Sequence, residues 1–555
     1  MKLKKMIYPK IPLAQSIIEI CNTKGLHHIV ISPGSRNAPL TIGFTNNPVF
    51  TCYSIADERC AAFFALGIAQ QLKKPVALVC TSGSALLNYY PAFAEAFYSQ
   101  IPLVVISADR PQSKIDIGDG QTIRQENVFA NHSLYNANLV ENVSEENDAK
   151  IQEAIHLATT KKGPVHINVP FEEPLYETVD TISVNTKIID FDTENKPLEN
   201  LDVFVNRWND AKKKLILIGG CDPNVIQQFI IDFLANDTSV VVMTEVTSNV
   251  HHANFITNID AIITPFTDDD FTNFQPEILI TMGGMIVSKR IKAFLRKYKP
   301  QQHWHIDELR AYDTFGSLTK HFEVLPSVFF KEFIPKINSL ESNYLPYSLE
   351  IKKVRTQKTN TYLATIPFSD FKAFEIILPK LPLYSQLQIS NSSAIRYAQL
   401  FSIHSSIEVF CNRGTSGIDG STSTAIGAAI ASGKETILIT GDISFLYDSN
   451  ALWNNYIPEN FKIILLNNGG GGIFRILPGH KENETFNTYF ETSHRLTAKY
   501  LAKMYNFGYE KAVDEKTLAE KLKITINTKK SIILEVFTPT KVNDLVLLNY
   551  FKNLT

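Results

Sequence analysis

Residues 437–472 read ILITGDISFLYDSNALWNNYIPENFKIILLNNGGGG and hold two short apolar runs, each followed at once by polar residues. The first run leads into Gly441-Asp442 and the second into Asn467-Asn468. Short apolar runs that end in turn residues are typical of buried parallel strands. Asp442 and Asn468 lie 26 positions apart, which leaves room for a helix and a return strand. We therefore predict two adjacent parallel strands in an α/β domain.

Two such strands would carry the carboxylate of Asp442 and the amide oxygen of Asn468 to the same edge of the sheet. Mg²⁺ prefers such oxygens and completes its coordination with phosphate oxygens. The glycines at 469–472 would let main-chain groups approach a diphosphate, and a helix beginning near Ser444 would point its N-terminus at the same anion. These features together predict a metal–diphosphate site. The alternative is an ordinary strand-to-helix turn beside an unrelated glycine loop.

The same order of strand, polar turn and helix recurs along the rest of the chain. A polar, aperiodic stretch at 180–200 is typical of a linker, and a second stretch at 335–372 has no clear period. We therefore predict three doubly wound α/β domains over 1–185, 200–335 and 373–555. The predicted strands are 28–31, 76–80, 103–106 and 165–169 in the first domain, 215–218, 240–243 and 278–281 in the second, and 437–440, 462–466 and 532–536 in the third.

Composition excludes several classes of protein. The 555 residues include 54 Lys and Arg against 56 Asp and Glu, and this balance argues against a basic nucleic-acid-binding protein. No apolar run approaches the ~20 residues that cross a bilayer, and prolines interrupt the N-terminal apolar residues, so we expect a cytoplasmic protein without a membrane span. The six cysteines form no CxxC pair, which predicts reduced, mostly buried thiols.

Charged residues mark the ends of several predicted strands and the start of one helix. Arg and Lys bind carboxylates well, so their number at these loops predicts a substrate with several negative charges. Taken singly, each could equally be a surface charge or a member of a structural ion pair. Glu58, at a predicted helix start, could serve a site or simply cap the helix. The cations are Arg36, Arg110, Lys289, Arg290 and Arg413, and a further polar cluster holds Asn391, Ser392 and Arg396.

Other motifs carry less weight. His251-His252 and the pair His303/His305 have no second ligand cluster at metal-binding spacing, so we interpret them as structural. The chain has no GxxxxGK[ST] phosphate loop, no GxSxG nucleophile motif and no convincing GxGxxG turn.

The Gly-Asp and Asn-Asn pairs at this separation resemble the signature of thiamine diphosphate-dependent enzymes, except that Ile443 replaces the second glycine of the common Gly-Asp-Gly form. From about residue 10 to the C-terminus, and least in the middle third, the chain is similar to the 2-succinyl-5-enolpyruvyl-6-hydroxy-3-cyclohexene-1-carboxylate synthases of menaquinone biosynthesis. The blocks that carry this resemblance are ISPGSRN (31–37), DER (57–59), ADRP (108–111), NRGTSGIDG (412–420), GDISFLYD (441–448) and NNGGGGIF (467–474).

The resemblance implies three domains of the thiamine diphosphate-dependent decarboxylase type: a pyrimidine-binding domain, a central domain, and a diphosphate- and metal-binding domain. It implies thiamine diphosphate and Mg²⁺ (or Mn²⁺) as cofactors, held between the subunits of a homodimer or homotetramer. Glu58 matches the glutamate that bonds the aminopyrimidine ring, and Ile418 matches the apolar residue that bends the cofactor. Asp442, Asn468 and the Gly470 carbonyl match the metal ligands, and Gly441, Ile443, Ser444 and Ile473 match further cofactor contacts.

The resemblance also implies the reaction. It is a decarboxylation of 2-oxoglutarate followed by addition of the succinyl carbanion equivalent to isochorismate. Ser392 and Arg396 match the residues that hold the distal carboxylate of the succinyl group. The isochorismate side is matched by Arg36, Arg110, Gln121, Lys289, Arg290 and Arg413, with Ile473, Phe474 and Leu477 as its apolar wall.

Two alternatives stay open. Another thiamine diphosphate-dependent 2-oxoacid decarboxylase or carboligase, such as an acetolactate-synthase-like enzyme, would share Glu58 and the metal ligands but would not need Arg36, Arg396 and Arg413 together. A catalytically inactive binding protein of the same fold is the second, and the intact glutamate and metal ligands argue against it.

Overall fold

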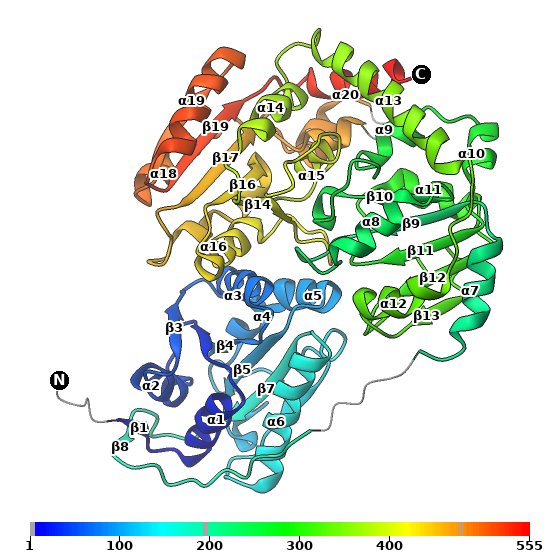
Figure 1. The fold of residues 1–555 in the computed structure, drawn as a ribbon. Helices are drawn as coiled ribbons and strands as arrows, with labels where there is room; N and C mark the ends of the chain where they lie inside the picture. The colour runs from blue at the N-terminus through cyan, green and yellow to red at the C-terminus, as the bar shows by residue number, and fades with distance from the viewer. Residues whose placement is uncertain (1–5, 192–197, 477–478, 480) are drawn as a thin grey trace. The chain divides into compact units, whose positions relative to one another are not determined.

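Three parallel sheets with helices around them form the framework of the chain in the computed structural model (Figure 1). The structure describes residues 6–191, 198–476, 479 and 481–555. The chain divides into two compact units: unit 1 comprises 1–193, 412–436 and 444–461, and unit 2 comprises 194–411, 437–443 and 462–555. The predicted fold class, doubly wound α/β, is confirmed, while the three domain boundaries stay a prediction.

The sheet of unit 1 is parallel and has the strand order β3-β2-β4-β5-β7-β6. Alternate side chains of its central strands point to opposite faces, and both faces are buried. Helices α1 (Pro12–Thr23) and α6 (Glu145–Thr160) cover one face, and α3 (Glu58–Leu72) contacts the strands from the other. The strands are β2 (His28–Ile31), β3 (Thr51–Ser54), β4 (Val76–Cys80), β5 (Leu103–Asp109), β6 (Asn136–Asn138) and β7 (Val165–Pro170).

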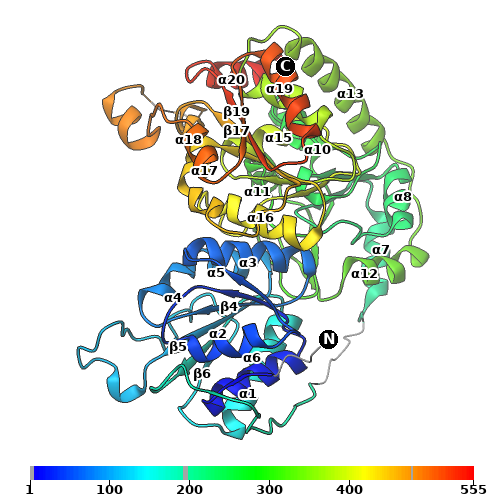
Figure 2. The same cartoon turned by 90° about the vertical axis from the view of Figure 1, so that its left-hand side faces the viewer.

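Helix α16 (Ser421–Ser432) lies along α3 within unit 1, as Figure 2 shows. Two glycines make this close approach possible. A Cβ at Gly67 would lie 2.1 Å from the carbonyl oxygen of Thr424, and a Cβ at Gly427 would lie 2.0 Å from that of Phe64. Both helix backbones therefore meet where no side chain intervenes. Unit 1 also contains α2 (Ala38–Asn46), α4 (Ser84–Asn88), α5 (Tyr90–Ser99) and an antiparallel pair, β1 (Tyr8–Pro9) with β8 (Thr178–Val179).

Unit 2 holds the two other parallel sheets. The first has the order β10-β9-β11-β12-β13, and two separate apolar cores lie on its two faces. One core contains residues of α7 (Leu201–Asp210), α8 (Gln228–Asn236) and α12 (Pro326–Phe333), and the other residues of α9 (Ile259–Ile263), α10 (Asp268–Phe274) and α11 (Lys289–Lys297). The strands are β9 (Lys214–Ile218), β10 (Val240–Thr244), β11 (Ile278–Met282), β12 (Gln302–Ile306) and β13 (Lys320–Phe322).

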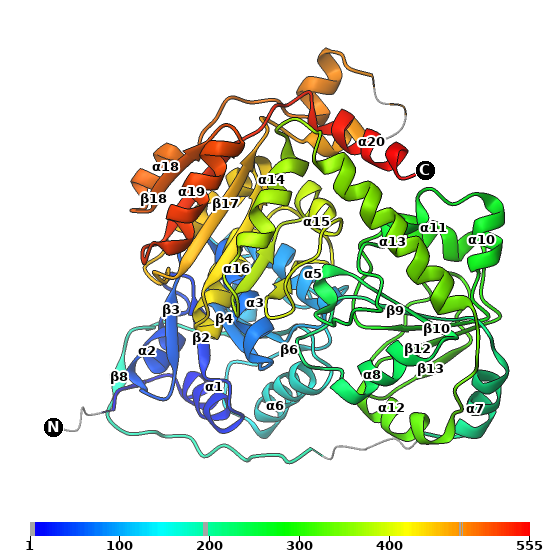
Figure 3. The same ribbon diagram turned by 45° about the horizontal axis from the view of Figure 1, so that its top comes forward.

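The last sheet has the order β15-β14-β16-β17-β19-β18. One apolar core joins a face of this sheet to α14 (Asp370–Ile377), α15 (Ser393–Ala398), α19 (Glu515–Asn527) and α20 (Asn543–Asn553); α14 and α19 lie side by side (Figure 3). The strands are β14 (Gln386–Ile389), β15 (Glu408–Phe410), β16 (Thr436–Gly441), β17 (Phe461–Asn467), β18 (Gly508–Ala512) and β19 (Ile532–Phe537). Helices α17 (Asp442–Tyr447) and α18 (Lys499–Met504) complete the segment.

Two segments differ from the sequence-based expectation. The stretch without a clear period contains the longest helix that the structure describes, α13 (Tyr344–Leu363). Only its two ends are buried, so the chain there carries no continuous apolar stripe. The helix expected near Ser444 begins at Asp442 instead and is six residues long.

Candidate active site

The carboxyl ends of β16 and β17 bring Asp442 and the glycine run together, as the sequence predicts. The two strands are neighbours in the sheet, and Asp442 follows β16 directly. Its Oδ2 accepts hydrogen bonds from the main-chain N–H groups of Gly469 (2.8 Å) and Gly470 (3.0 Å). The carboxylate is therefore held against the turn that follows Asn468, at the edge where parallel sheets bind ligands.

Asn468 presents an unused oxygen at this edge. Its Nδ2 donates to Asp370 Oδ2 at 2.9 Å, whereas its Oδ1 is buried and has no hydrogen-bond partner among the described residues. A buried amide oxygen without a partner is costly, so native structures normally provide one. Mg²⁺ and Mn²⁺ prefer hard oxygen donors, and this edge offers three: the Asp442 carboxylate, Asn468 Oδ1 and the Gly470 carbonyl oxygen. The residues present therefore fit a divalent cation.

Two residues at this edge have no counterpart in the sequence-based site. His494 Nε2 lies 3.3 Å from Asp442 Oδ2, and that carboxylate raises the pKa of His494 above its ordinary value. Asp370 is buried, and burial raises the pKa of its carboxyl group to about 6. Both reach the edge from segments far away in the chain, and neither belongs to a motif that would have predicted it.

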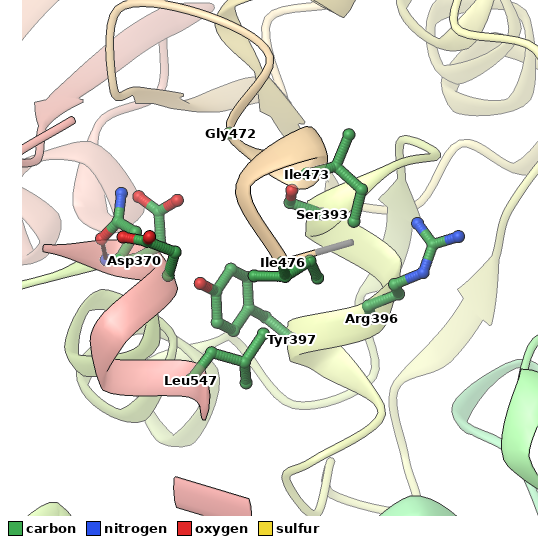
Figure 4. A pocket seen from close by; sticks show the side chains of 10 residues that line it. Asp370, Ser393, Arg396, Tyr397, Gly472, Ile473, Ile476 and Leu547 are labelled. Carbon is green, nitrogen blue, oxygen red and sulfur yellow. Dashed lines mark hydrogen bonds between the residues drawn. The ribbon is translucent and has the colours of Figure 1, made fainter. Parts of the chain in front are cut away.

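A small hollow, partly open to solvent, lies next to the glycine run in unit 2 (Figure 4). Helix α15 contributes Arg396, whose Nη1 donates to the carbonyl oxygen of Ser392 at 2.7 Å. Ser392 itself has φ +68°, a conformation that residues other than glycine adopt mainly where a turn or a site requires it. The lining consists of Asp370, Ser393, Arg396, Tyr397, Gly472, Ile473, Ile476, Asn543, Asp544 and Leu547.

The 3₁₀ helix η6 (Gly472–Ile476) forms one wall of this hollow. Ile473 lies in the lining, and the ring of Phe474 packs edge-on against that of Phe490 with centroids 6.0 Å apart. Leu477, the third predicted wall residue, lies outside the described residues.

The predicted cations Lys289 and Arg290 are the first two residues of α11, and both are exposed. The Arg290 guanidinium lies 4.6 Å from the centre of the Phe551 ring. Nearby, burial raises the pKa of Asp260, and the positive charges of Arg290 and Arg396 partly offset that rise. Arg290 and Arg396 thus act on the same buried carboxyl group within unit 2.

In unit 1, Glu58 is the first residue of α3, and the cap of that helix is its neighbour. Asp57 Oδ1 accepts from the N–H of Cys60 at 3.1 Å, which is the usual N-cap bond. Burial and, to a smaller extent, the charge of Asp57 raise the pKa of Glu58. The carboxyl group of Glu58 is therefore not needed as the helix cap.

The loop that carries Arg413 and Ile418 is held by a buried carboxylate that sequence reasoning missed. Glu95 in α5 accepts from the main-chain N–H groups of Gly414 (2.8 Å) and Thr415 (2.6 Å). Beyond Arg413, the Ile418 carbonyl oxygen accepts from Ser444 Oγ at 2.9 Å. Glu95 lies more than 300 positions before the loop, so no local pattern could have identified it.

Arg36 and Arg110 follow β2 and β5 at the carboxyl ends of these strands. Arg36 is 5% exposed, and its Nη1 donates to the carbonyl oxygen of Phe171 at 3.1 Å, while the N–H of Phe171 donates to the carbonyl oxygen of Asp109. Arg110 Nε donates to the carbonyl oxygen of Gly120 at 2.9 Å, which fixes the loop that presents Gln121. The structure thus brings Arg36, Arg110 and Gln121 to the carboxyl edge of the unit 1 sheet.

The predicted residues divide between the two units. Unit 1 contains seven of them: Arg36, Glu58, Arg110, Gln121, Arg413, Ile418 and Ser444. Unit 2 contains the other described ones: Lys289, Arg290, Ser392, Arg396, Gly441, Asp442, Ile443, Asn468, Gly470, Ile473 and Phe474.

The histidine pairs and the cysteines have structural surroundings. His303 Nε2 and His305 Nδ1 each lie 2.8 Å from Thr281 Oγ1, and burial lowers the pKa of both rings to about 4. All six cysteines are free thiols, and Cys21, Cys60 and Cys80 are buried. Within the described ranges, no three His, Cys, Asp or Glu side chains gather closely enough to hold a metal ion. Every described helix is too short or too polar to cross a bilayer.

Comparison with known proteins agrees with this arrangement. Residues 11–134 match the family described as thiamine pyrophosphate enzyme, N-terminal TPP binding domain, and residues 392–536 match the corresponding C-terminal TPP binding domain. These matches support thiamine diphosphate as a cofactor.

Several curated relatives carry the name 2-succinyl-5-enolpyruvyl-6-hydroxy-3-cyclohexene-1-carboxylate synthase. That of Flavobacterium johnsoniae is 67% identical over 99% of this chain and 100% of its own length. That of Christiangramia forsetii is 54% identical over 98% of this chain and 99% of its own length, and that of Porphyromonas gingivalis is 39% identical over 96% of each. The chain therefore belongs to the 2-succinyl-5-enolpyruvyl-6-hydroxy-3-cyclohexene-1-carboxylate synthase family of thiamine diphosphate-dependent enzymes.

Proposed function

We propose that the chain is a transferase that decarboxylates 2-oxoglutarate and adds the succinyl unit to isochorismate, giving CO₂ and 2-succinyl-5-enolpyruvyl-6-hydroxy-3-cyclohexene-1-carboxylate for menaquinone biosynthesis. The observation that supports this proposal is the edge of unit 2, where oxygens of the kind that a divalent cation prefers adjoin a hollow beside Arg396. A 2-oxoacid decarboxylase for a dicarboxylate needs both features next to each other.

The metal site would consist of Asp442, Asn468 Oδ1 and the carbonyl of Gly470, with Mg²⁺ or Mn²⁺ as the ion. The fit rests on the buried Asn468 oxygen, which has no partner in the described part of the chain, and on the fixed orientation of the Asp442 carboxylate. A hard cation held by few protein oxygens keeps positions for phosphate oxygens, so the same ion would fix a diphosphate. Gly441, Ile443, Ser444 and Ile473 would complete the cofactor contacts.

Thiamine diphosphate, when bound, supplies the carbanion and the electron sink that decarboxylation of a 2-oxoacid requires. Glu58 would bond the aminopyrimidine ring and hold a proton there. Its raised pKa suits this role, because a carboxyl group that keeps its proton more readily can both share and return it. Ile418 would supply the apolar support that bends the cofactor, on a loop fixed by Glu95 and Ser444.

The cations would bind the two substrates. Ser392 and Arg396 would hold the distal carboxylate of the succinyl group, since Arg binds carboxylates through two parallel hydrogen bonds. Ile473, Phe474 and Leu477 would shield the acceptor ring from water. The acceptor's own carboxylates would meet the remaining polar set: Arg36, Arg110, Gln121, Lys289, Arg290 and Arg413.

The proposal extends to the assembly. We propose a homo-oligomer, a dimer or a tetramer, with active sites between subunits and with domains at 1–185, 200–335 and 373–555. The cytoplasmic location expected from the sequence stays a prediction.

The test is CO₂ release from 2-oxoglutarate by the purified protein with thiamine diphosphate and Mg²⁺, with and without isochorismate. We expect strong release only with isochorismate, and a product whose mass equals isochorismate plus the succinyl unit. Pyruvate, assayed in parallel, separates this function from an acetolactate-synthase-like one. Preference for pyruvate, or release that does not depend on isochorismate, would discard the proposed reaction while keeping the cofactor.

A further inference from the structure

A buried carboxylate that the reaction itself does not use lies directly against a proposed metal ligand. Asp370 is the first residue of α14 and is 3% exposed. Its Oδ2 accepts from Asn468 Nδ2 at 2.9 Å, and its Oδ1 accepts from Thr538 Oγ1 at 2.6 Å. Its own N–H donates to Asn543 Oδ1 at 2.8 Å. Asp370 is therefore held in place by the segment after β19 and by the start of α20.

These contacts determine which way the Asn468 amide faces. An ionised carboxylate only accepts hydrogen bonds, so the side of the amide that faces Asp370 must be its NH₂ group. The oxygen must then point to the opposite side, where Oδ1 is buried without a partner among the described residues. The main chain of Asn468 is also fixed, because its carbonyl oxygen accepts from Thr540 Oγ1 at 2.6 Å. The flip of the amide is the freedom that Asp370 removes.

We propose that Asp370 is a positioning residue that turns the Asn468 oxygen toward the divalent cation; this inference rests on the metal site of the proposed function. Groups that orient a metal ligand through a hydrogen bond typically change metal affinity by about 10- to 100-fold when they are removed. In this role Asp370 acts on the metal through Asn468 and not by its own contact with the ion, so its effect must appear in metal binding and not in turnover alone.

The experiment measures Mn²⁺ binding to the full-length protein with saturating thiamine diphosphate, from the electron paramagnetic resonance signal of free Mn²⁺. We expect Asp370→Ala to weaken Mn²⁺ binding about 10- to 100-fold. We expect Asp370→Asn to weaken Mn²⁺ binding less than about threefold. The oxygen of the new amide can still accept from Asn468 Nδ2, which keeps the Asn468 oxygen in place. The cost is about a factor of two, because the new amide must adopt one of its two orientations. Thr538→Val, which removes the other bond to Asp370, should also stay within about threefold.

Equal losses of Mn²⁺ affinity in Asp370→Asn and Asp370→Ala would assign the effect to the lost charge and overturn the positioning role. An unchanged Mn²⁺ affinity in Asp370→Ala would also overturn the positioning role. If Asp370→Ala does not fold, Asp370→Leu removes the acceptor while filling the space, and the same expectation applies to it. Asn468→Ala is measured alongside. Unchanged Mn²⁺ binding in that variant would reject the metal site itself, independently of what the Asp370 variants show.

Discussion

Replacing Glu95 with glutamine should weaken the hold on the loop that carries Arg413. Glu95 is 1% exposed, and its two oxygens accept four hydrogen bonds. Oε1 accepts from the N–H of Gly414 (2.8 Å) and from Ser99 Oγ (2.6 Å). Oε2 accepts from the N–H of Thr415 (2.6 Å) and from its Oγ1 (2.8 Å). Each carboxylate oxygen therefore holds one main-chain N–H group that cannot change its role.

Glutamine has a single oxygen, so either way its amide turns, one of these two N–H groups faces an NH₂ group. A buried donor left without an acceptor costs about 1–3 kcal/mol. If the loop leaves its place to avoid that cost, binding of isochorismate, which we propose Arg413 helps to hold, weakens roughly five- to a hundredfold. We expect the KM for isochorismate to rise by about tenfold, within that range. The KM for 2-oxoglutarate should change less than about twofold, since Arg396 is held in unit 2 by the carbonyl oxygen of Ser392, whereas Glu95 and the loop belong to unit 1.

Steady-state kinetics with each substrate varied at saturating concentrations of the other separates the two effects. Ser99→Ala is the matched control, because it removes one donor to the same carboxylate and leaves both main-chain bonds intact. It should change neither KM by more than about threefold, since the loss of one such bond is worth roughly 0.5–1.5 kcal/mol and does not involve the loop. An unchanged KM for isochorismate in Glu95→Gln would refute the role of Glu95 in holding the loop. An equal rise in both KM values would refute it as well.

Four further perturbations test other parts of the structure. Glu58→Gln should still bind thiamine diphosphate, followed by fluorescence quenching, but lose most turnover; near-normal turnover would remove its role. Arg396→Ala should raise the KM for 2-oxoglutarate roughly ten- to a hundredfold and that for isochorismate far less, since a charge-assisted bond is worth about 1.5–3 kcal/mol. Burial raises the pKa of Asp448 from 3.8 to about 7. Between these pH values the native protein therefore holds a proton on Asp448 that the unfolded chain has released, and the contribution of Asp448 to the free energy of unfolding falls as the pH rises. Asp448→Asn should remove up to about 1.4 kcal/mol per pH unit of that slope in urea unfolding curves, and an unchanged slope would contradict the assignment. Gly427→Ala should lower the free energy of unfolding by about 1–3 kcal/mol because its Cβ would meet the Phe64 carbonyl, and wild-type stability would show that the helices can separate freely.

The sheets could be predicted from the sequence because their strands are buried on both faces. Strands β2 and β4 have the predicted bounds, and the other eight predicted strands extend further, mostly by one residue at an end. Such strands read as uninterrupted apolar runs between turn residues, which is a strong local signal. Seven further strands of these sheets are missing from the prediction: β3, β6, β12, β13, β14, β15 and β18. Helix α13 gives no clear signal, since its fully buried residues lie towards its two ends and none of the residues between them is fully buried. Its position depends on packing that the local sequence does not encode.

Part of the candidate site could be predicted for the same reason. Asp442 and Asn468 follow adjacent strands directly, so the sheet itself carries them to one edge. Asp370 and Glu95 could not be predicted, because the groups that they hold lie 98 and 319 positions away in the chain. Such pairs arise from tertiary packing alone, and a single sequence contains no pattern for them.

Helix starts explain why the carboxylates of the site are hard to recognise. A carboxylate in a first turn usually interacts with the helix dipole, so the position of Glu58 or Asp370 alone does not distinguish a site residue from a structural one. In both helices, however, the preceding residue already caps the free N–H groups: Asp57 accepts from Cys60, and Ser369 accepts from Lys372 at 3.3 Å. The capping bond is thus satisfied without the carboxylate that follows. Asp370 is thereby left to accept from the amide of Asn468, and Glu58 is left available for its proposed bond to the pyrimidine ring.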